Sequence, residues 1–456
     1  MLTSPPAGRP SADRFLKVFL AFVSLVLATL VWILGLVDSF GKPSVAPALS
    51  LEQKELSLLA QPNIPEPLRP LVVGKDPAAS LLDTLRVTPL DRLDDRQILL
   101  FTALEQDETY RASLRQVTIG QPELIPLQQA LLGNEGPEQG RSELLALAPD
   151  PLIRRVVCSA LGGSSADCVD SAQASAAARR LVFSEVFPLA ALILGGLLLV
   201  RHGWLLLRRR LPSWPPLVSA PLSPLDMVLL VAGGFVVLGE VLVPLLIAPF
   251  TTWVSRGLSP ALMQGLTVLV GYAALAVPPL LILRQQLSQC DQEAPPSGGW
   301  LQWQARPISS ALLQGARGWL MVMPPVVLSG WLVSRWIGDQ GGSNPLLEIV
   351  LNSRDPLALA LLAITAVVLA PLFEETIFRG VLLPVLGRFL GRVGSVLVSA
   401  LVFAIAHLSI GELPPLLVLG VGLALLRLST GRLFPCVVMH SLWNGVTFLN
   451  LLLLGA

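Results

Sequence analysis

The fold class of this chain is decided by Leu357–Leu386, which reads LALALLAITAVVLAPLFEETIFRGVLLPVL. A helix of about 30 residues is roughly 45 Å long, whereas the hydrocarbon core of a bilayer is about 30 Å thick. Pro371 removes one backbone hydrogen bond, and Gly380 loosens the helix beyond it. We therefore expect a membrane-spanning helix with a kink or a break. Its two glutamates, Glu374 and Glu375, lie between those two points.

Two later apolar segments each contain a pair of motif residues that lie four positions apart, which is about one helical turn. Phe403 is followed by His407, and His440 by Asn444, in a chain that has three histidines in all. Residues four apart share one face of a helix. Ionisable groups at membrane depth are costly, usually line an interior cavity and mark functional positions. We expect these faces and the glutamates to meet in one cavity.

The composition is that of a polytopic membrane protein. The 456 residues are 53% hydrophobic and 14% charged, whereas a soluble domain carries about 25% charge. The net charge of +1 gives no sign of a nucleic-acid partner. The chain has four cysteines and no CxxC pair, so a structural zinc knuckle is not expected. Cys158 and Cys168 lie ten residues apart, and a disulfide and a reduced pair both stay open.

Apolar runs predict an all-α, polytopic membrane bundle of about nine transmembrane helices, with a small, mainly helical extramembrane domain inserted after the first helix. The expected spans are 15–37, 181–200, 225–250, 262–283, 319–337, 357–386, 394–410, 413–426 and 433–454. The expected regions are 1–40 (cytoplasmic tail and signal-anchor helix), 41–180 (extracytoplasmic domain), 181–309 (transmembrane helices two to four with their loops) and 310–456 (catalytic membrane domain).

The orientation follows from the loop arginines. The first span is long for a signal peptide and has no clear cleavage site, so we expect an uncleaved anchor with its N-terminus in the cytoplasm. An odd number of spans then places the C-terminus outside, and residues 41–180 become periplasmic, lumenal or extracellular. The arginines that this topology places in cytoplasmic loops are Arg201, Arg208, Arg209, Arg210, Arg284, Arg306, Arg317, Arg388, Arg392, Arg427 and Arg432.

Peptide hydrolysis inside a membrane requires that water be admitted, that its proton be removed and that the oxyanion be stabilised. A glutamate with a histidine performs the second task. A histidine with an asparagine performs the third by donating hydrogen bonds. This chain supplies that set of residues and shows no Gly-x-Ser-x-Gly elbow, HExxH motif or phosphate-binding loop.

The order and spacing of the motifs resemble the CPBP family of intramembrane proteases, also known as ABI-domain or type II CAAX prenyl endopeptidase-like proteins. The matching elements are EExxxR at Glu374, Glu375 and Arg379, then FxxxH, then HxxxN. The resemblance covers about residues 310–456. The three motifs together, in family order and in apolar segments, form a specific signal.

The resemblance implies that Glu374 and His407 activate the attacking water, and that His440 and Asn444 stabilise the oxyanion. It leaves the cofactor open. Glu374, His407 and His440 would suit a catalytic zinc ion, whereas a metal-free glutamate mechanism needs none.

Three further residues are expected to support these groups. Glu375 and Arg379 form an i, i+4 pair in the favourable orientation and are interpreted as a structural clamp. Phe403 is interpreted as a packing residue.

Three other polar or aromatic residues lie outside these roles. Glu240 is a further intramembrane acid, either functional or bonded to a neighbouring helix. His202 and Trp443 are interpreted as residues of the membrane interface.

One spacing argues against a shared cavity. Glu374 and His407 lie about 14 and 15 residues from the nearest cytoplasmic arginine, and His440 only about 8. At 1.5 Å per residue His440 is roughly 10 Å shallower, unless the helices tilt or the last span begins before Leu433.

We therefore expect an intramembrane endopeptidase that cuts a membrane-anchored protein or peptide, in a lipid bilayer. A catalytically silent scaffold or immunity-type protein of the same fold is the alternative. A secondary transporter is a third hypothesis, although no internal repeat of broken helices is seen. The sequence does not address the identity or prenylation of the substrate, or the oligomeric state.

Overall fold

The protein is all-α in the computed structural model, as predicted. The structure describes residues 12–42, 44–133, 140–254, 256–290, 294–338, 341–342 and 345–455, and no strand occurs among them. Residues 1–11 of the predicted cytoplasmic tail lie outside the described residues. The chain divides into a membrane unit, Met1–Val45 with Ala190–Leu452, and a small unit, Ala46–Leu189 with Leu453–Ala456.

The small unit is a set of short helices around its own core. Its α-helices are α2 (Ala46–Ala60), α3 (Arg69–Val72), α4 (Pro77–Val87), α5 (Asp95–Leu104), α6 (Glu108–Leu114), α7 (Ile125–Leu132), α8 (Arg141–Ala146), α9 (Pro151–Ala160), α10 (Ser165–Cys168) and the first part of α11 (Ser171–Leu207). Leucines such as Leu81, Leu99 and Leu127 are fully buried in this core. The structure joins Cys158 to Cys168 in a disulfide.

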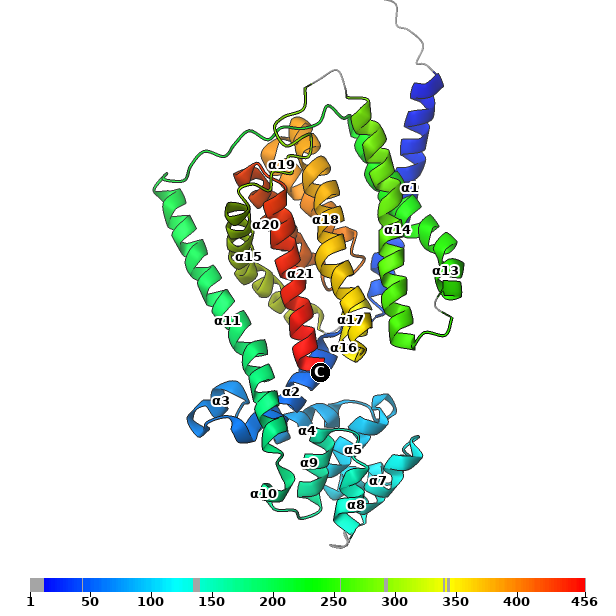
Figure 1. Cartoon of the computed structure of the whole chain (residues 1–456), viewed down its shortest axis with the longest axis vertical. Helices are drawn as coiled ribbons and strands as arrows, with labels where there is room; N and C mark the ends of the chain where they lie inside the picture. The colour runs from blue at the N-terminus through cyan, green and yellow to red at the C-terminus, as the bar shows by residue number, and fades with distance from the viewer. Residues whose placement is uncertain are drawn as a thin grey trace, which may run out of the picture. The chain divides into compact units, whose positions relative to one another are not determined.

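The membrane unit contains the long apolar helices. Its α-helices are α1 (Ala12–Ser39), the rest of α11, α12 (Pro224–Val228), α13 (Val243–Val254), α14 (Pro260–Ser288), α15 (Ile308–Ile337), α16 (Pro345–Asn352), α17 (Pro356–Ala363), α18 (Ala370–Glu375), α19 (Leu383–Ile405), α20 (Leu413–Thr430) and α21 (Phe434–Gly455). Three π-helical segments interrupt them, η6 (Leu229–Leu242), η7 (Ile364–Leu369) and η8 (Thr376–Leu382). Figure 1 shows α18, α20 and α21 side by side.

Eight helices of the described chain are long and apolar enough to cross a membrane, compared with the nine spans predicted. The longest runs from Pro356 to Ile405 and contains the predicted span 357–386 and most of the predicted span 394–410. It is not straight, because Gly391 has φ +68° and ψ −178°. Beyond this glycine the helix packs back on itself, and the rings of Phe378 and Phe403 lie 5.5 Å apart in a T-shaped contact.

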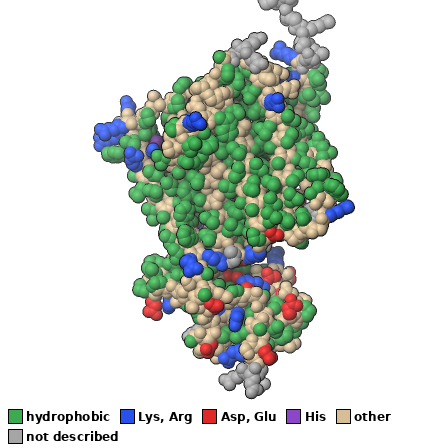
Figure 2. Space-filling model, viewed as in Figure 1, with side chains coloured by type: hydrophobic (Ala, Val, Ile, Leu, Met, Phe, Trp, Pro, Cys, Tyr) green, Lys and Arg blue, Asp and Glu red, His purple; other side chains and the backbone are tan. Residues whose placement is uncertain are grey.

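The first helix packs on the bundle. Lys17 of α1 forms an ion pair with Asp226 of α12, and Ala28 is buried. Other side chains of α1, such as Phe15 and Val37, are exposed. Figure 2 shows that hydrophobic side chains cover the visible face of the membrane unit. Exposed apolar side chains on this scale are those of helices in lipid, so the protein is an integral, multi-pass membrane protein.

An ion pair between Arg86 and Glu105 allows the electrostatics of the small unit to be tested. Arg86 donates two hydrogen bonds to Glu105, at 2.8 and 2.7 Å, and lowers the pKa of that carboxyl below its ordinary value of 4.5. A carboxyl with a lowered pKa stabilises the fold above its ordinary pKa, and this contribution is lost as the pH falls through the lowered value. We expect the opening free energy of α4 and α5, obtained from hydrogen exchange after correction for the intrinsic exchange rate at each pH, to fall on acidification below about pH 5.

The control is Glu105→Gln, which keeps a hydrogen-bond acceptor without the charge. Its opening free energy should depend less on pH than that of the wild-type protein. An equal fall in the two proteins would contradict the ion pair.

Candidate active site

The helix that carries Glu374 and Glu375 is called the first-motif helix. Its predicted break is present as two π-helical segments, η7 and η8. Glu374 and Glu375 end α18, which lies between η7 and η8. In π-helical turns an N–H bonds to the carbonyl five residues earlier in the chain. The helix therefore stays continuous, but its register shifts before and after the glutamates.

Because of Pro371, the backbone carbonyl of Ala366 lacks an N–H partner in its own helix and instead binds Asn444, the asparagine of the third motif. The N–H of Ala370 donates to Thr365 O, five residues back, so the next N–H in that register would reach Ala366 O. Proline has no N–H, and Ala366 O instead accepts a hydrogen bond from Asn444 Nδ2 at 2.8 Å. Asn444 is thereby fixed to the first-motif helix.

Pro384 repeats this arrangement two turns after the glutamates. The N–H of Leu383 donates to Phe378 O, so residue 384 would reach Arg379 O in the same register. That carbonyl accepts a hydrogen bond from Arg427 Nε at 3.2 Å instead. The two prolines thus leave carbonyl oxygens that side chains of α21 and α20 satisfy.

The prediction that Arg427 lies in a cytoplasmic loop is wrong. Arg427 is fully buried within α20, and its Nη2 also donates to Gln302 Oε1. Two of its nitrogens, Nε and Nη2, donate to fixed oxygen acceptors, which offsets part of the cost of burying the cation.

A buried carboxylate links the first motif to the third. Glu375 Oε1 accepts a hydrogen bond from Arg379 Nη1 at 3.0 Å and lies 2.9 Å from His440 Nδ1. The side chains of Glu375 and Arg379 are 0% exposed. Arg379 Nη2 also donates to Gly420 O at 3.1 Å. The predicted i, i+4 contact is therefore present, and it extends to two further helices, α20 and α21.

Phe403 packs between these charged and polar groups. Its ring is fully buried and lies 4.9 Å from the His407 ring and 5.7 Å from the His440 ring. The guanidinium carbon of Arg379 lies 4.3 Å from the ring centroid. The structure thus places Phe403 as a packing residue in contact with three motif residues.

Glu374 lies at the centre of the site. Its Oε1 accepts a hydrogen bond from Tyr272 Oη at 2.8 Å. Its Oε2 lies 3.9 Å from His440 Nε2 and has no hydrogen-bond partner among the described residues. Sequence reasoning missed Tyr272. The signal in the sequence was Tyr272 itself, one of two tyrosines in the chain, which lies within an apolar span. A buried phenol needs a hydrogen-bond partner.

His407 lies beyond the end of its helix, and the prediction that its whole motif is helical is wrong. Helix α19 ends at Ile405, and Leu408 has φ +52°, which does not continue a right-handed helix. His407 Nδ1 lies 2.8 Å from Phe403 O. A carbonyl only accepts, so Nδ1 carries the proton, and Nε2 of the neutral ring is free to accept one.

The depth difference expected for His440 does not arise. A Cβ added to Gly380 would lie 3.2 Å from Leu301 Cδ2 and 3.2 Å from Leu433 Cδ2. Gly380 therefore lies level with Leu433, and Leu301 brings the loop before α15 into the bundle. Glu374 is six residues from Gly380, and His440 is seven from Leu433. The two side chains consequently reach the same depth.

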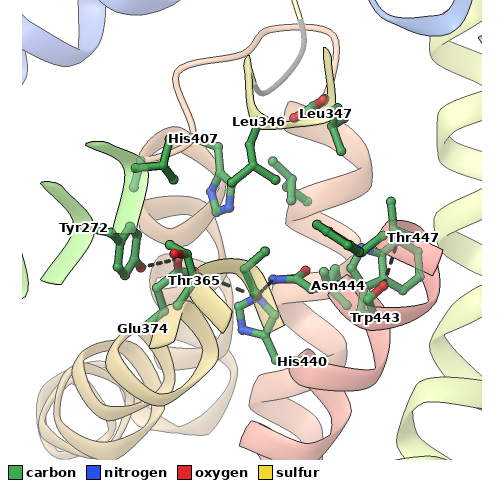
Figure 3. A pocket seen from close by; sticks show the side chains of 18 of the residues that line it. Tyr272, Leu346, Leu347, Thr365, Glu374, His407, His440, Trp443, Asn444 and Thr447 are labelled. Carbon is green, nitrogen blue, oxygen red and sulfur yellow. Dashed lines mark hydrogen bonds and ion pairs between the residues drawn. The ribbon is translucent and has the colours of Figure 1, made fainter. Parts of the chain in front are cut away.

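The four predicted catalytic residues line one cavity of about 620 Å³. Figure 3 shows His407, Glu374, His440 and Asn444 around it, with Tyr272 beside Glu374. Glu240 also lines this cavity, and His202 does not.

Trp443 was expected at the membrane interface, but it forms part of the cavity wall. The reason is its position next to Asn444 on α21, at the depth of the site.

Zinc binding by Glu374, His407 and His440 stays a prediction. Among the described residues no three His, Cys, Asp or Glu side chains are grouped closely enough to hold a metal ion. His440 Nδ1 is engaged by Glu375. The proposed steps use only groups of the chain.

A comparison with known families finds a match over the part of the chain that contains these residues. Residues 356–446 match the family described as "Type II CAAX prenyl endopeptidase Rce1-like", which confirms the predicted resemblance. The match begins later than residue 310. The similarity to the CPBP family that the motifs indicated is therefore carried by this region of the chain.

Residues 46–179 match a domain of unknown function, DUF8675. No curated protein and no solved structure matches the chain.

The buried clamp predicts a large loss of stability on removing one partner. Arg379→Met would leave the Glu375 carboxylate without its cation, and breaking a buried pair in this way costs about 3–5 kcal/mol. We expect the Tm of the purified protein in detergent to fall sharply. Arg392→Met, at an exposed position, is the matched control. A similar Tm for the two variants would contradict the clamp.

Proposed function

We propose that the protein is an intramembrane endopeptidase that hydrolyses a peptide bond in a membrane-anchored protein or peptide. The observation that carries the proposal is the position of Glu374. Its free Oε2 faces a cavity within the membrane unit, 3.9 Å from His440 Nε2. The family match over residues 356–446 supports the same class of reaction.

Glu374 and His407 are the proposed water-activating pair. Glu374 Oε1 is held by Tyr272, which leaves Oε2 to accept a proton from water. His407 Nδ1 faces the Phe403 carbonyl, so Nε2 of the neutral ring orients that water by accepting a hydrogen bond from its second O–H. The resulting hydroxide attacks the substrate carbonyl carbon, and Glu374 passes the proton to the leaving nitrogen as the C–N bond breaks.

His440 and Asn444 are the proposed oxyanion donors. Asn444 Nδ2 has two hydrogens, and the bond to Ala366 O uses one of them. His440 Nδ1 donates to Glu375, so Nε2 donates to the oxyanion when the ring is an imidazolium. Glu375 stabilises that cation, and Arg379 fixes Glu375. Preorganised donors of this kind lower the barrier without reorganising.

The proposed topology has a cytoplasmic N-terminus and places residues 41–180 outside the cytoplasm. The loop arginines support it, with Arg427 now removed from that set. Exposed arginines 208–210 at the end of α11 remain on the predicted cytoplasmic side.

The proposal predicts at least one peptide bond whose cleavage depends on Glu374. Membranes of cells that carry the intact protein or Glu374→Ala should differ in the terminal peptides found by quantitative proteomics. Loss of an activating carboxylate should lower the cleavage rate by about 10²–10⁴-fold. His407→Ala should remove the same products.

The matched control is Glu348→Ala, because Glu348 is exposed on α16 and does not line the cavity. It should leave the products unchanged. Identical terminal peptides in the intact and Glu374→Ala membranes, with equal insertion of both proteins, would favour the silent-scaffold alternative.

Tyr272→Phe should reduce activity without abolishing it. The substitution removes the hydroxyl that holds Glu374, and a hydrogen bond to a charged group is worth about 1.5–3 kcal/mol. We expect kcat/KM to fall about 10–100-fold. Tyr110→Phe, at the other tyrosine of the chain, should have no effect. An unchanged kcat/KM in Tyr272→Phe would show that Glu374 needs no such support.

A further inference from the structure

The small unit has a second hydrophobic cluster, which includes the ends of two membrane helices. Leu181 of α11 and Leu454, near the end of α21, are buried there with Ile64 and Val73, and all four belong to the small unit. Both helices are candidate membrane spans. Leu181 precedes Arg201 of α11 by 20 residues, and a helix of that length is about as long as the hydrocarbon core is thick. The cluster therefore lies close to the surface of the bilayer.

A polar contact of the same unit indicates the same depth. Gln53 Nε2 of α2 donates a hydrogen bond to Glu185 Oε1 of α11. Glu185 lies one turn beyond Leu181, in the direction of the membrane span. A carboxyl at this depth is costly without a polar partner. Helix α2 therefore also reaches the level at which α11 enters the bilayer.

The 64–73 segment, Ile64–Val73, exposes two leucines at this level. Leu68 is 48% exposed, and Leu71 of α3 is 83% exposed. The buried side chains of Ile64 and Val73 hold both ends of the segment in the cluster, and Figure 1 shows α3 beside the lower part of α11. Phe183, near the point where α11 enters the bilayer, is exposed as well. Exposed apolar side chains of this size mark a contact surface.

Polar groups of the 64–73 segment bind one another. Arg69 Nε donates to Ile64 O at 2.9 Å, and Arg69 Nη1 lies 3.7 Å from Glu66 Oε1. The N–H of Arg69 donates to Pro65 O at 3.1 Å. Three of the ten residues of the segment are prolines, which have no N–H group. The segment therefore brings few unpaired donors into a layer of low polarity, where such groups are costly.

We propose that the 64–73 segment is a lipid-binding surface, which inserts Leu68 and Leu71 into the headgroup layer of the bilayer beside α11. This layer is about 5–7 Å thick on each side of the hydrocarbon core. The occupant is lipid because the segment is fixed where a membrane helix begins, and because its apolar side chains point outward while its charges are paired. The proposal concerns the small unit and does not depend on the proposed hydrolysis.

The experiment uses the full-length protein in phosphatidylcholine nanodiscs. Leu71→Cys provides a single site for the fluorophore NBD. Cys158 and Cys168 are joined in a disulfide, and the two free cysteines are buried, so the unsubstituted protein is the control for labelling. A fraction of the lipids carries a nitroxide on the headgroup or the upper acyl chain, and quenching by these lipids reports contact between the label and the interfacial layer.

We expect nitroxide lipids to quench NBD at position 71 about twofold, because an apolar side chain in this position lies among the headgroups. Leu68→Cys should respond in the same way and is the second variant if Leu71→Cys fails to insert. Leu147→Cys is the matched control, because Leu147 is 39% exposed just after α8. Figure 1 shows α8 at the opposite end of the small unit from α3, and NBD at position 147 should not be quenched.

Equal quenching at positions 71 and 147 would overturn the proposal, and so would a lack of quenching at both 68 and 71. An NBD emission at position 71 that is shifted to shorter wavelength, but is not quenched by nitroxide lipids, would show that a protein surface such as a second copy of the chain covers the leucines. That result would also overturn the proposal. None of these outcomes changes the test of the proposed endopeptidase, which uses Glu374→Ala.

Discussion

The site depends on one buried carboxylate. Glu375 Oε1 contacts both Arg379 and His440, which lie on different helices. A buried carboxylate is costly unless such partners compensate it. The contact therefore fixes the distance between α18 and α21. The preceding residue, Glu374, lies near the other ring nitrogen of His440, Nε2. The catalytic geometry proposed here follows from the requirement to satisfy this charge.

Two prolines impose a similar requirement on backbone carbonyl groups. Pro371 and Pro384 each leave the carbonyl five residues earlier without its N–H partner, at Ala366 and Arg379. Asn444 and Arg427 satisfy these oxygens. Unsatisfied backbone groups cost several kcal/mol in lipid, so the two side chains hold α21 and α20 against the first-motif helix. The π-helical turns that make these carbonyls available also flank the glutamates.

The sequence predicted the all-α fold, the break near Pro371 and the Glu375–Arg379 pair, because these depend on hydropathy and local spacing. It could not predict the partners that depend on tertiary placement. Tyr272 meets Glu374 from a helix 102 residues away in the chain. The sequence places Arg427 in a loop because the apolar run of its span ends just before it. Its buried position depends on the acceptors Arg379 O and Gln302 Oε1, which come from distant parts of the chain. His407 was placed in a helix because the turn at Leu408 has no proline or glycine to announce it.

The most direct test is an experimental structure of the protein in a lipid nanodisc, determined by electron cryo-microscopy. The account predicts Glu374 Oε2 near 3.9 Å from His440 Nε2 and His440 Nδ1 near 2.9 Å from Glu375 Oε1. It also predicts that the His407 ring faces the same cavity. A map in which Glu374 faces lipid, or in which the two late histidines lie in separate cavities, would contradict it.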